Sequence, residues 1–326
     1  MARPSQIKKQ LIADILQDQF TSVFSVPDKS LNYQKYLPDN PRIDSPLTEL
    51  QITNGAVIRA INEIKASSSC PKHDIPAKVF KECKNTLCTP LTLFWKKSIE
   101  SGQIPQCYKN QLIIPLHKKG LKTKAENFRP VTLSSHDIKI FERVVRNWLV
   151  NYLEGNSIFS SNQHGFRRGH SCSTQLLSYS YNIFNNSVEG NDTDCVYLDY
   201  SKAFDKVDHE VLLNKLRYYN IPELYLNWFK NFLDGRKQSV YLNGSYSYSS
   251  SVQSGVPQGS VLGPLFFIIY INDLPNIIHN SRILTYADDT KIISDVRSVN
   301  DTINLQNDLN RIVEWSKDNN MKLNSN

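Results

Sequence analysis

Residues 196–208 read VYLDYSKAFDKVD, and residues 283–294 read ILTYADDTKIIS. Each stretch places carboxylates at the end of a short apolar run, with Asp199 in the first and Asp288 and Asp289 in the second. The first run predicts a buried strand over 195–200, and the second predicts a β-hairpin with its tip at 287–289. If the strand pairs beside the hairpin, these carboxylates face one another at one edge of a sheet.

Carboxylates gathered in this way indicate a metal site. Adjacent carboxylates flanked by apolar strands repel and raise each other's pKa unless a cation neutralises them. Hard oxygen ligands suit Mg²⁺, and two ions about 4 Å apart can activate a 3′-hydroxyl and stabilise a leaving pyrophosphate. The alternative is an exposed turn, because a Tyr-Ala-Asp-Asp stretch in isolation needs no metal.

Hydrophobic periodicity predicts helices around these strands, and therefore an α+β fold in which helices surround an antiparallel sheet. Pro27, Pro38, Pro41 and Pro46 predict a linker in the N-terminal part. The expected helices cover 7–24, a segment from Thr53, 90–101, 138–153, a segment after Asp208, 222–235 and 300–317; a strand is expected at 112–116 and a second hairpin at 238–252, turned at Asn243-Gly244.

The composition is that of a folded globular protein, because 40% of the 326 residues are hydrophobic and 21% are charged. The formal charge of +7 suits a polyanionic partner. The longest apolar stretch, 261–271, is too short to span a bilayer, so an intracellular protein of the nucleus, the cytoplasm or both is expected, with no membrane partner. Reduced thiols are expected rather than zinc or disulfides, because no CxxC pair occurs among Cys70, Cys83, Cys88, Cys107, Cys172 and Cys195.

Five motifs, in a fixed order, resemble the reverse transcriptase domain of non-LTR (LINE-type, jockey- or CR1-like) retrotransposons. Residues 198–208 resemble motif A, residues 254–264 (SGVPQGSVLGP) resemble motif B, and residues 286–289 resemble motif C. Upstream, residues 113–120 with 127–131, and then residues 163–167, resemble the two fingers motifs. One departure is CPKHDIP at 70–76, where the family has a Gly-Pro-Asp-Gly-like stretch.

The resemblance implies the fingers and palm of a right-hand polymerase in residues 91–326, with an antiparallel palm sheet flanked by helices. An N-terminal helical extension and linker would occupy residues 1–90. The implied activity is RNA-directed DNA polymerisation with two Mg²⁺ ions, Mn²⁺ being possible, and with an RNA template, a DNA primer and deoxynucleoside triphosphates as partners. Residues 321–324 resemble the start of motif D, so the thumb and the motif D lysine are expected to be missing.

The resemblance also implies a role for each motif residue. Phe204 corresponds to the steric gate that blocks a 2′-hydroxyl, although an ordinary core aromatic is common at such a strand-to-helix junction. Lys118 and Arg129 would grip the triphosphate, and Gly255 and Gly259 would let the backbone approach the substrate. The implied sets are Asp199, Asp288 and Asp289 for catalysis and metal binding; Lys118, Arg129, Tyr200, Phe204, Gln258 and Gly259 for the nucleotide; and Arg167, Arg168 and His170 for the template backbone.

Two other functions stay open. A non-catalytic nucleic-acid-binding remnant would keep the basic groove without turnover. A metal-dependent phosphoesterase would use the same carboxylates, but a hydrolase has no use for the Phe204 gate or the Gln258 loop.

Overall fold

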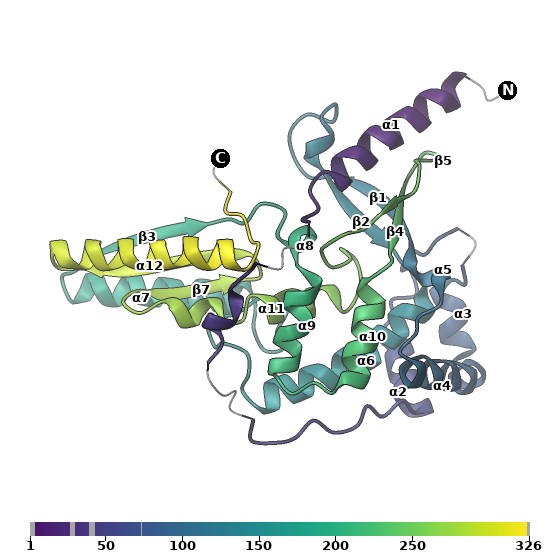
Figure 1. The fold of residues 1–326 in the computed structure, drawn as a ribbon, viewed down its shortest axis with the longest axis horizontal. Coiled ribbons are helices and arrows are strands. Elements are labelled where there is room, and N and C mark those ends of the chain that lie inside the picture. Colours follow the sequence, from purple (N-terminus) through teal and green to yellow (C-terminus); the bar gives the residue numbers. More distant parts are fainter. Residues whose placement is uncertain (1–3, 27–29, 39–42, 73, 325–326) are drawn as a thin grey trace.

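The structure is a computed structural model that describes residues 4–26, 30–38, 43–72 and 74–324. Figure 1 shows an arm that contains β3, β7, α7 and α12, and a larger body in which α1 lies beside β1, β2 and β4. The helices are α1 (Pro4–Thr21), α2 (Asn54–Asn62), α3 (Ala77–Glu82), α4 (Lys84–Ser101), α5 (Gln106–Lys109), α6 (His136–Gly155), α7 (Cys172–Val188), α8 (Ala203–Lys206), α9 (His209–Tyr218), α10 (Glu223–Leu233), α11 (Gly263–Tyr270) and α12 (Val299–Asp318), with 3-10 turns η1 (Tyr33–Tyr36), η2 (Ala125–Asn127) and η3 (Leu274–Ile277).

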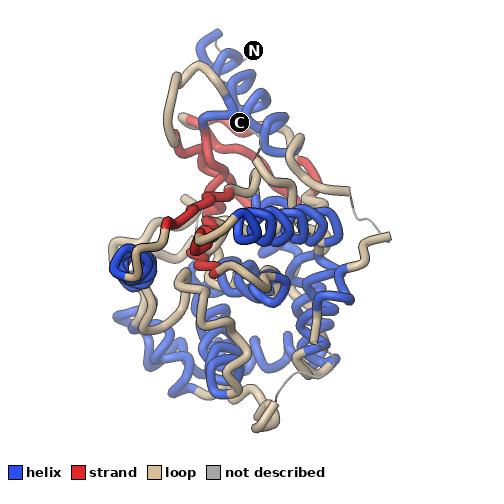
Figure 2. The backbone as a smooth tube through the Cα atoms, turned by 90° about the vertical axis from the view of Figure 1, so that its left-hand side faces the viewer, coloured by secondary structure: helices blue, strands red, loops and turns tan. Residues whose placement is uncertain are grey.

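The strands form two sheets, which Figure 2 shows in red. The first has the order β2-β1-β4-β5, with β6 also paired to β4, and the second has the order β3-β8-β7. The strands are β1 (Asn110–His117), β2 (Phe128–Leu133), β3 (Asp192–Leu198), β4 (Lys237–Leu242), β5 (Ser245–Tyr246), β6 (Ser250–Ser251), β7 (Arg282–Tyr286) and β8 (Asp289–Val296).

The α+β class predicted from the sequence is confirmed, but the sheets are not wholly antiparallel. The β3-β8-β7 sheet is antiparallel throughout. In the other sheet β1 pairs with β4 in parallel, beginning with Asn110 opposite Lys237. This parallel pair was not predicted, because a hydrophobic pattern predicts a strand but does not show which distant strand pairs with it.

Both predicted hairpins are confirmed. In the first, β4 and β5 are joined by Asn243 and Gly244, whose φ angles of 48° and 88° are those of a two-residue turn that matches the twist of its strands. In the second, β7 and β8 are joined by Ala287 and Asp288, and Tyr286 pairs with Asp289 at the last position of the ladder.

The bounds of α4 differ from the sequence prediction, and α3, α5, α7, α8 and α11 were not predicted. The helix expected at 90–101 begins at Lys84, with Pro90 inside it, because Cys88 and Trp95 bury the same face of α4 on both sides of the proline. Helix α7 begins with a capping box between Ser171 and Thr174. Its apolar residues Leu177, Tyr181, Phe184 and Val188 recur at helical spacing, on a face that the structure leaves exposed.

The N-terminal part packs against the rest of the chain. From α1, the buried residues Ala13, Leu16 and Phe20 form a small core with Ile113 of β1 and Val240 of β4. The expected division after residue 90 falls inside α4. Within the predicted linker, Pro27 and Pro41 lie outside the described residues, while the 50–52 segment joins the main core.

The main core lies among α4, α6, α9, α10 and α11. It contains a stacked pair of rings, Trp95 and Phe141, with centroids 4.4 Å apart. It also buries the ammonium group of Lys215, which donates to Asp273 Oδ1 and Asn319 Oδ1 at 2.7 Å each. None of the described helices combines the length and the apolar character needed to cross a bilayer.

Candidate active site

The strand register brings the predicted carboxylates to one end of the β3-β8-β7 sheet. The last β3 pair is Leu198 with Thr290, so Asp199 leaves β3 at the level of the hairpin turn. Asp199 and Asp288 line one cavity of about 450 Å³. Asp289, the first residue of β8, is exposed and lies outside that lining.

The electrostatic environment of Asp288 favours a cation. Burial raises the pKa of the Asp288 carboxyl above its ordinary value, the neighbouring charges of Asp289 and Asp199 raise it further, and Lys118 acts in the opposite direction. Asp199 Oδ2 accepts a hydrogen bond of 2.9 Å from Asn324 Nδ2. A cation between the carboxylates would relieve their repulsion.

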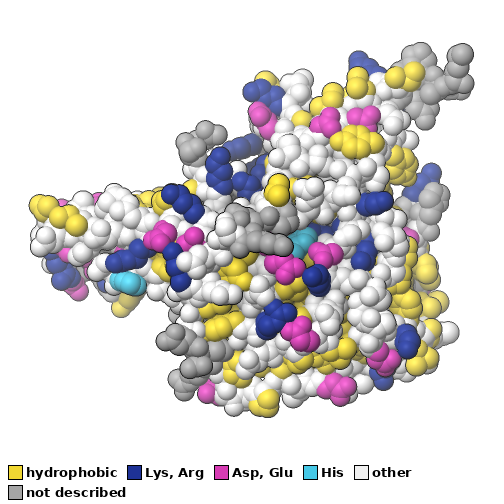
Figure 3. Space-filling view, viewed as in Figure 1, with side chains coloured by type: hydrophobic (Ala, Val, Ile, Leu, Met, Phe, Trp, Pro, Cys, Tyr) yellow, Lys and Arg dark blue, Asp and Glu magenta, His cyan; other side chains and the backbone are white. Residues whose placement is uncertain are grey.

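Cationic residues line the same cavity. Lys118 follows β1 and Arg129 lies in β2, and both are exposed where they line it. The Lys118 N–H donates to the Asn127 carbonyl at 2.8 Å, which closes the loop between the two strands. Figure 3 shows Lys and Arg side chains gathered where the arm meets the body. The cavity therefore joins anionic and cationic walls, as a metal-bound phosphate requires.

The ring of Phe204 is supported by two other aromatic rings. It stacks on Phe267 of α11, with ring centroids 4.3 Å apart and an interplanar angle of 18°. Phe166 meets it edge-on, at 6.1 Å and 85°. Phe204 also lines the cavity, so this aromatic is a cavity wall that the core holds in place.

Asp205 is a residue of this cavity that the sequence analysis missed. Its side chain is buried at 6% exposure, and its Oδ1 accepts from Gln258 Nε2 at 2.7 Å. Its Oδ2 has no hydrogen-bond partner among the described residues. Burial raises the pKa of Asp205 to about 6, although the Gln258 bond opposes this. The bond orients the Gln258 amide, and Gln258 also lines the cavity.

The 254–262 loop is held by buried polar side chains. Glu142 of α6 accepts from the backbone N–H groups of Val261 and Leu262 at 2.6 and 2.9 Å. Burial raises the pKa of Glu142 to about 7, against the effect of these two bonds. A Cβ at Gly259, which has a φ of +114°, would lie 2.7 Å from the Thr132 carbonyl. The tight approach at this glycine is therefore to β2.

A second support that the sequence analysis missed lies under the carboxylate hairpin. Gln163 Oε1 accepts from the backbone N–H groups of Gly165 and Ala287 at 2.7 and 2.9 Å. The His164 N–H donates to the Thr285 carbonyl at 2.8 Å. Segment 162–165 thus forms a brace that fixes the turn carrying Asp288. Its motif was recognised, but this contact spans 124 positions and leaves no local pattern.

Tyr200 is placed differently from the other predicted nucleotide contacts. It is a lining residue of the cavity, but its side chain is only 3% exposed. Its ring lies 6.3 Å from that of Trp315 in α12. The phenol therefore faces the core, and any contact of this side chain with a nucleotide stays a prediction.

The three residues predicted to bind the template differ in their contacts and in their exposure. Arg167 forms a two-point contact with Glu154, at 3.0 and 2.7 Å, and donates to the Ser160 carbonyl. This geometry favours a structural role for Arg167 over the template contact expected from the sequence. Arg168 is exposed, and His170 is half-buried with its ring 5.3 Å from that of His164.

The carboxylates of the cavity fit a magnesium ion that keeps water and substrate phosphates as its remaining ligands. No group of three or more His, Cys, Asp or Glu side chains with metal-binding geometry occurs in the described part of the chain. Mg²⁺ is usually bound through one or two carboxylates, with waters and substrate phosphates completing the shell. Asp199 and Asp288 supply such carboxylates, and the raised pKa of Asp288 is the perturbation that a cation would remove.

Comparison with known proteins adds an independent line of evidence. Residues 116–326 match the family described as "Reverse transcriptase (RNA-dependent DNA polymerase)". The chain is 27% identical over 337 residues to the RNA-directed DNA polymerase from mobile element jockey of Drosophila melanogaster, covering 99% of this chain and 36% of that protein.

Two further Drosophila melanogaster proteins are similar. The probable RNA-directed DNA polymerase from transposon BS is 26% identical over 97% of this chain, and that from transposon X-element is 28% identical over 87%. The matches cover 36% and 32% of those two proteins, so the chain spans about a third of the length of these curated relatives.

Proposed function

The chain belongs to the reverse transcriptase (RNA-dependent DNA polymerase) family, and from this premise we propose that it copies RNA into DNA as the polymerase core of a non-LTR retrotransposon. The observation that carries the proposal is the 450 Å³ cavity. It combines two carboxylates of different chain segments with a phosphate-binding wall and a supported aromatic. A phosphoesterase could use the carboxylates and the cationic wall, but it has no use for the supported aromatic Phe204 or for Gln258.

Each residue of the cavity has its own role in nucleotidyl transfer. Lys118 and Arg129 hold the triphosphate, Arg129 being suited to a two-point contact with its oxygens. Gln258, oriented by Asp205, contacts the nucleotide beside the sugar. Phe204 packs under the sugar, where a 2′-hydroxyl would collide with its ring, since Phe267 prevents the ring from retreating.

Asp199 and Asp288 would hold two Mg²⁺ ions, with Asp289 assisting from the start of β8. When bound, such ions supply an activated primer 3′-hydroxyl and charge stabilisation at the leaving pyrophosphate. The brace formed by residues 162–165 keeps Asp288 in position. In this proposal the β3-β8-β7 sheet is the palm, and β1 with β2 belongs to the fingers.

Primer extension tests the proposal. The protein is incubated with a DNA primer on an RNA template, deoxynucleotides and Mg²⁺, and we expect elongation that stops when the metal is chelated. Asp288→Ala should abolish elongation. Asp192→Ala is the matched control, because Asp192 is exposed at the opposite end of β3, paired with Val296.

The alternative outcomes are distinct. Salt-dependent binding of the primer–template without elongation would favour the non-catalytic nucleic-acid-binding function. Elongation that persists in Asp288→Ala would reject the assignment of the carboxylates.

A further inference from the structure

We propose that Arg236 and His209 are positioning residues for the choice of nucleotide sugar. Their side chains form a clamp on the Gly255 carbonyl, and this clamp fixes Gln258 relative to Phe204. Neither Arg236 nor His209 lines the active-site cavity, so both act through the residues that do. The inference rests on the proposed polymerase function.

The Gly255 carbonyl is the atom group on which the two side chains meet. Arg236 Nη2 donates to this oxygen at 2.5 Å, and His209 Nε2–H donates to it at 2.9 Å. A carbonyl oxygen has two lone pairs and can accept both bonds. Arg236 lies between α10 and β4, and His209 begins α9. Two segments 27 positions apart therefore act on one atom.

Both side chains of the clamp are themselves held in place. Arg236 is 3% exposed, and its Nε donates to the Leu233 carbonyl at 2.6 Å. Burial lowers the pKa of Arg236 to about 10, while Asp234 and Asp205 favour its charged form, so the guanidinium stays charged at neutral pH. His209 Nδ1–H donates to Asp234 Oδ1 at 3.2 Å. Each donor therefore has a fixed direction, as a positioning role requires.

The loop that contains Gly255 lies directly on the segment that carries Phe204. The Val256 N–H donates to the Phe204 carbonyl at 2.9 Å, and the Gly255 N–H donates to the Val207 carbonyl at 2.8 Å. A Cβ at Gly255, which has a φ of +81°, would lie 2.7 Å from the Phe204 carbonyl oxygen. This close approach leaves no room for the loop to shift while the clamp holds it.

The same loop carries Gln258, three residues after Gly255. The Gln258 carbonyl accepts from the Thr132 N–H at 2.7 Å, and its Nε2 donates to Asp205 Oδ1 at 2.7 Å. Gln258 and Phe204 line the cavity from different segments of the chain. A shift of Gly255 therefore changes the spacing between the Gln258 amide and the Phe204 ring, and with it the room for a 2′-hydroxyl.

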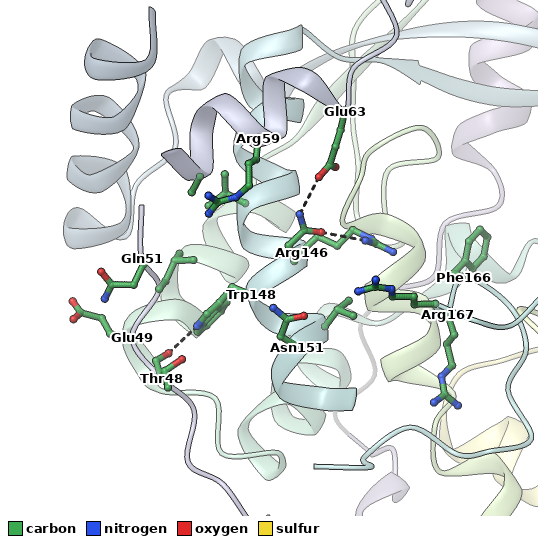
Figure 4. Close-up of a pocket in the computed structure, with 16 residues that line it drawn as sticks. Thr48, Glu49, Gln51, Arg59, Glu63, Arg146, Trp148, Asn151, Phe166 and Arg167 are labelled. Carbon is green, nitrogen blue, oxygen red and sulfur yellow. Dashed lines mark hydrogen bonds between the residues drawn. The ribbon is translucent and has the colours of Figure 1, made fainter. Parts of the chain in front are cut away.

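The clamp is separate from the aromatic support of Phe204. Phe166, one of the two rings beside Phe204, borders a larger cavity of about 880 Å³, which Figure 4 shows with residues of α2 and α6. Neither Arg236 nor His209 lines this larger cavity. Loss of the clamp should therefore loosen the loop while the Phe204 ring stays stacked, and its effect should be smaller than that of deleting the ring.

Single-nucleotide incorporation tests the proposal, with kcat, KM and the preference for a deoxy- over a ribonucleotide as readouts. Arg236→Met and His209→Ala should each raise KM about tenfold, the lower end of what a hydrogen bond to a charged group contributes. Each should lower the sugar preference by roughly three- to tenfold, a part of what the ring itself supplies. Because the clamp does not contact the catalytic carboxylates, kcat should stay within about threefold.

Conservative variants and a matched control separate positioning from folding. Arg236→Lys and His209→Gln each keep a donor that can point at Gly255, and they should recover most of the wild-type KM and sugar preference. Arg311→Met removes an arginine of α12 that contacts Asp308 at 2.6 Å. Asp308 keeps its bonds from three backbone N–H groups, so this control should keep KM and the preference. The melting temperature of every variant is measured in parallel.

Three results would overturn the inference. The first is a fall in kcat and melting temperature with KM and the sugar preference unchanged, since that pattern belongs to a clamp that only supports the fold. The second is an equal change of KM and preference in Arg311→Met and Arg236→Met. The third is a failure of both conservative variants to recover the wild-type values.

The two proposals fail separately. Equilibrium binding of the two nucleotides with Ca²⁺ in place of Mg²⁺ reports the sugar preference without elongation. If the wild-type protein binds the deoxynucleotide more tightly, Arg236→Met loses this preference and no primer is elongated, the positioning role stands and the polymerase function falls. If the wild-type protein elongates primers and both clamp variants keep its sugar preference, the polymerase function stands and the positioning role falls.

Discussion

Replacing Gly165 by alanine should displace the hairpin turn that carries the catalytic carboxylates, although the added methyl group does not contact them. A Cβ at Gly165 would lie 2.3 Å from the Ala287 nitrogen and 3.1 Å from the Ala287 Cα. Carbon atoms in contact prefer about 3.5 Å or more. Gly165→Ala therefore requires the brace and the hairpin turn to separate by about 1 Å, and it strains both hydrogen bonds to Gln163 Oε1.

This separation should affect catalysis more than substrate binding. A displacement of about 1 Å at a reacting group can cost about a hundredfold in rate, and overpacking costs about 1–3 kcal/mol of folding free energy. We expect kcat for single-nucleotide incorporation to fall by about a hundredfold. KM for the nucleotide should change little, because Lys118 and Arg129 belong to the other sheet.

Gly155→Ala is the matched control. No atom lies within 4 Å of a Cβ at that position, at the end of α6, and its φ is not positive. It should leave both kinetic constants and the melting temperature close to wild type. The reasoning would be refuted if Gly165→Ala kept kcat within about threefold while remaining folded by circular dichroism.

Three further predictions concern other parts of the molecule. Phe204→Ala should lower the preference for deoxy- over ribonucleotides by about ten- to a hundredfold in primer extension; an unchanged ratio would reject the gate. Glu142 has a folded pKa of about 7, above its ordinary value of 4.5, so the stability linked to its protonation is present below about pH 4.5 and is lost as the pH rises through 7. Glu142→Gln keeps an acceptor for Val261 and Leu262, and its unfolding free energy relative to wild type should rise by about 2–3 kcal/mol between pH 5 and 8; parallel urea-denaturation profiles would contradict this. Lys215→Met should cost about 3–5 kcal/mol in the same measurement because Asp273 is left buried without a partner, and adding Asp273→Leu should recover much of that loss.

The sequence predicted the local features of this fold well because their causes are local. Asn243-Gly244 and Ala287-Asp288 are turn residues between alternating strands, so both hairpins could be located within a residue or two. The carboxylates at the strand end and at the hairpin tip followed from the same patterns. Their presence in one cavity depends on β3 pairing with β8, which the sequence analysis stated as a condition.

The supporting contacts could not be predicted in this way. Gln163 reaches Ala287, and Glu142 reaches Val261, across more than a hundred positions. Arg167 has the appearance of a free basic residue in the sequence, yet Glu154 pairs with it because α6 ends beside its loop. Such contacts depend on where the ends of helices lie in the folded protein, and the hydrophobic periodicity of a sequence does not predict those positions.

The parallel pairing of β1 with β4 has a consequence for how the protein is made. Asn110 pairs with Lys237, 127 positions further along the chain. At a synthesis rate of about 5–20 residues per second, β1 leaves the ribosome about 6–25 s before its partner exists. During that interval β1 can pair with β2 on one edge, while its other edge offers unsatisfied backbone groups to any neighbouring strand. The growing chain is therefore exposed to aggregation until β4 is complete, and holdase chaperones should bind translation intermediates that end between these two strands.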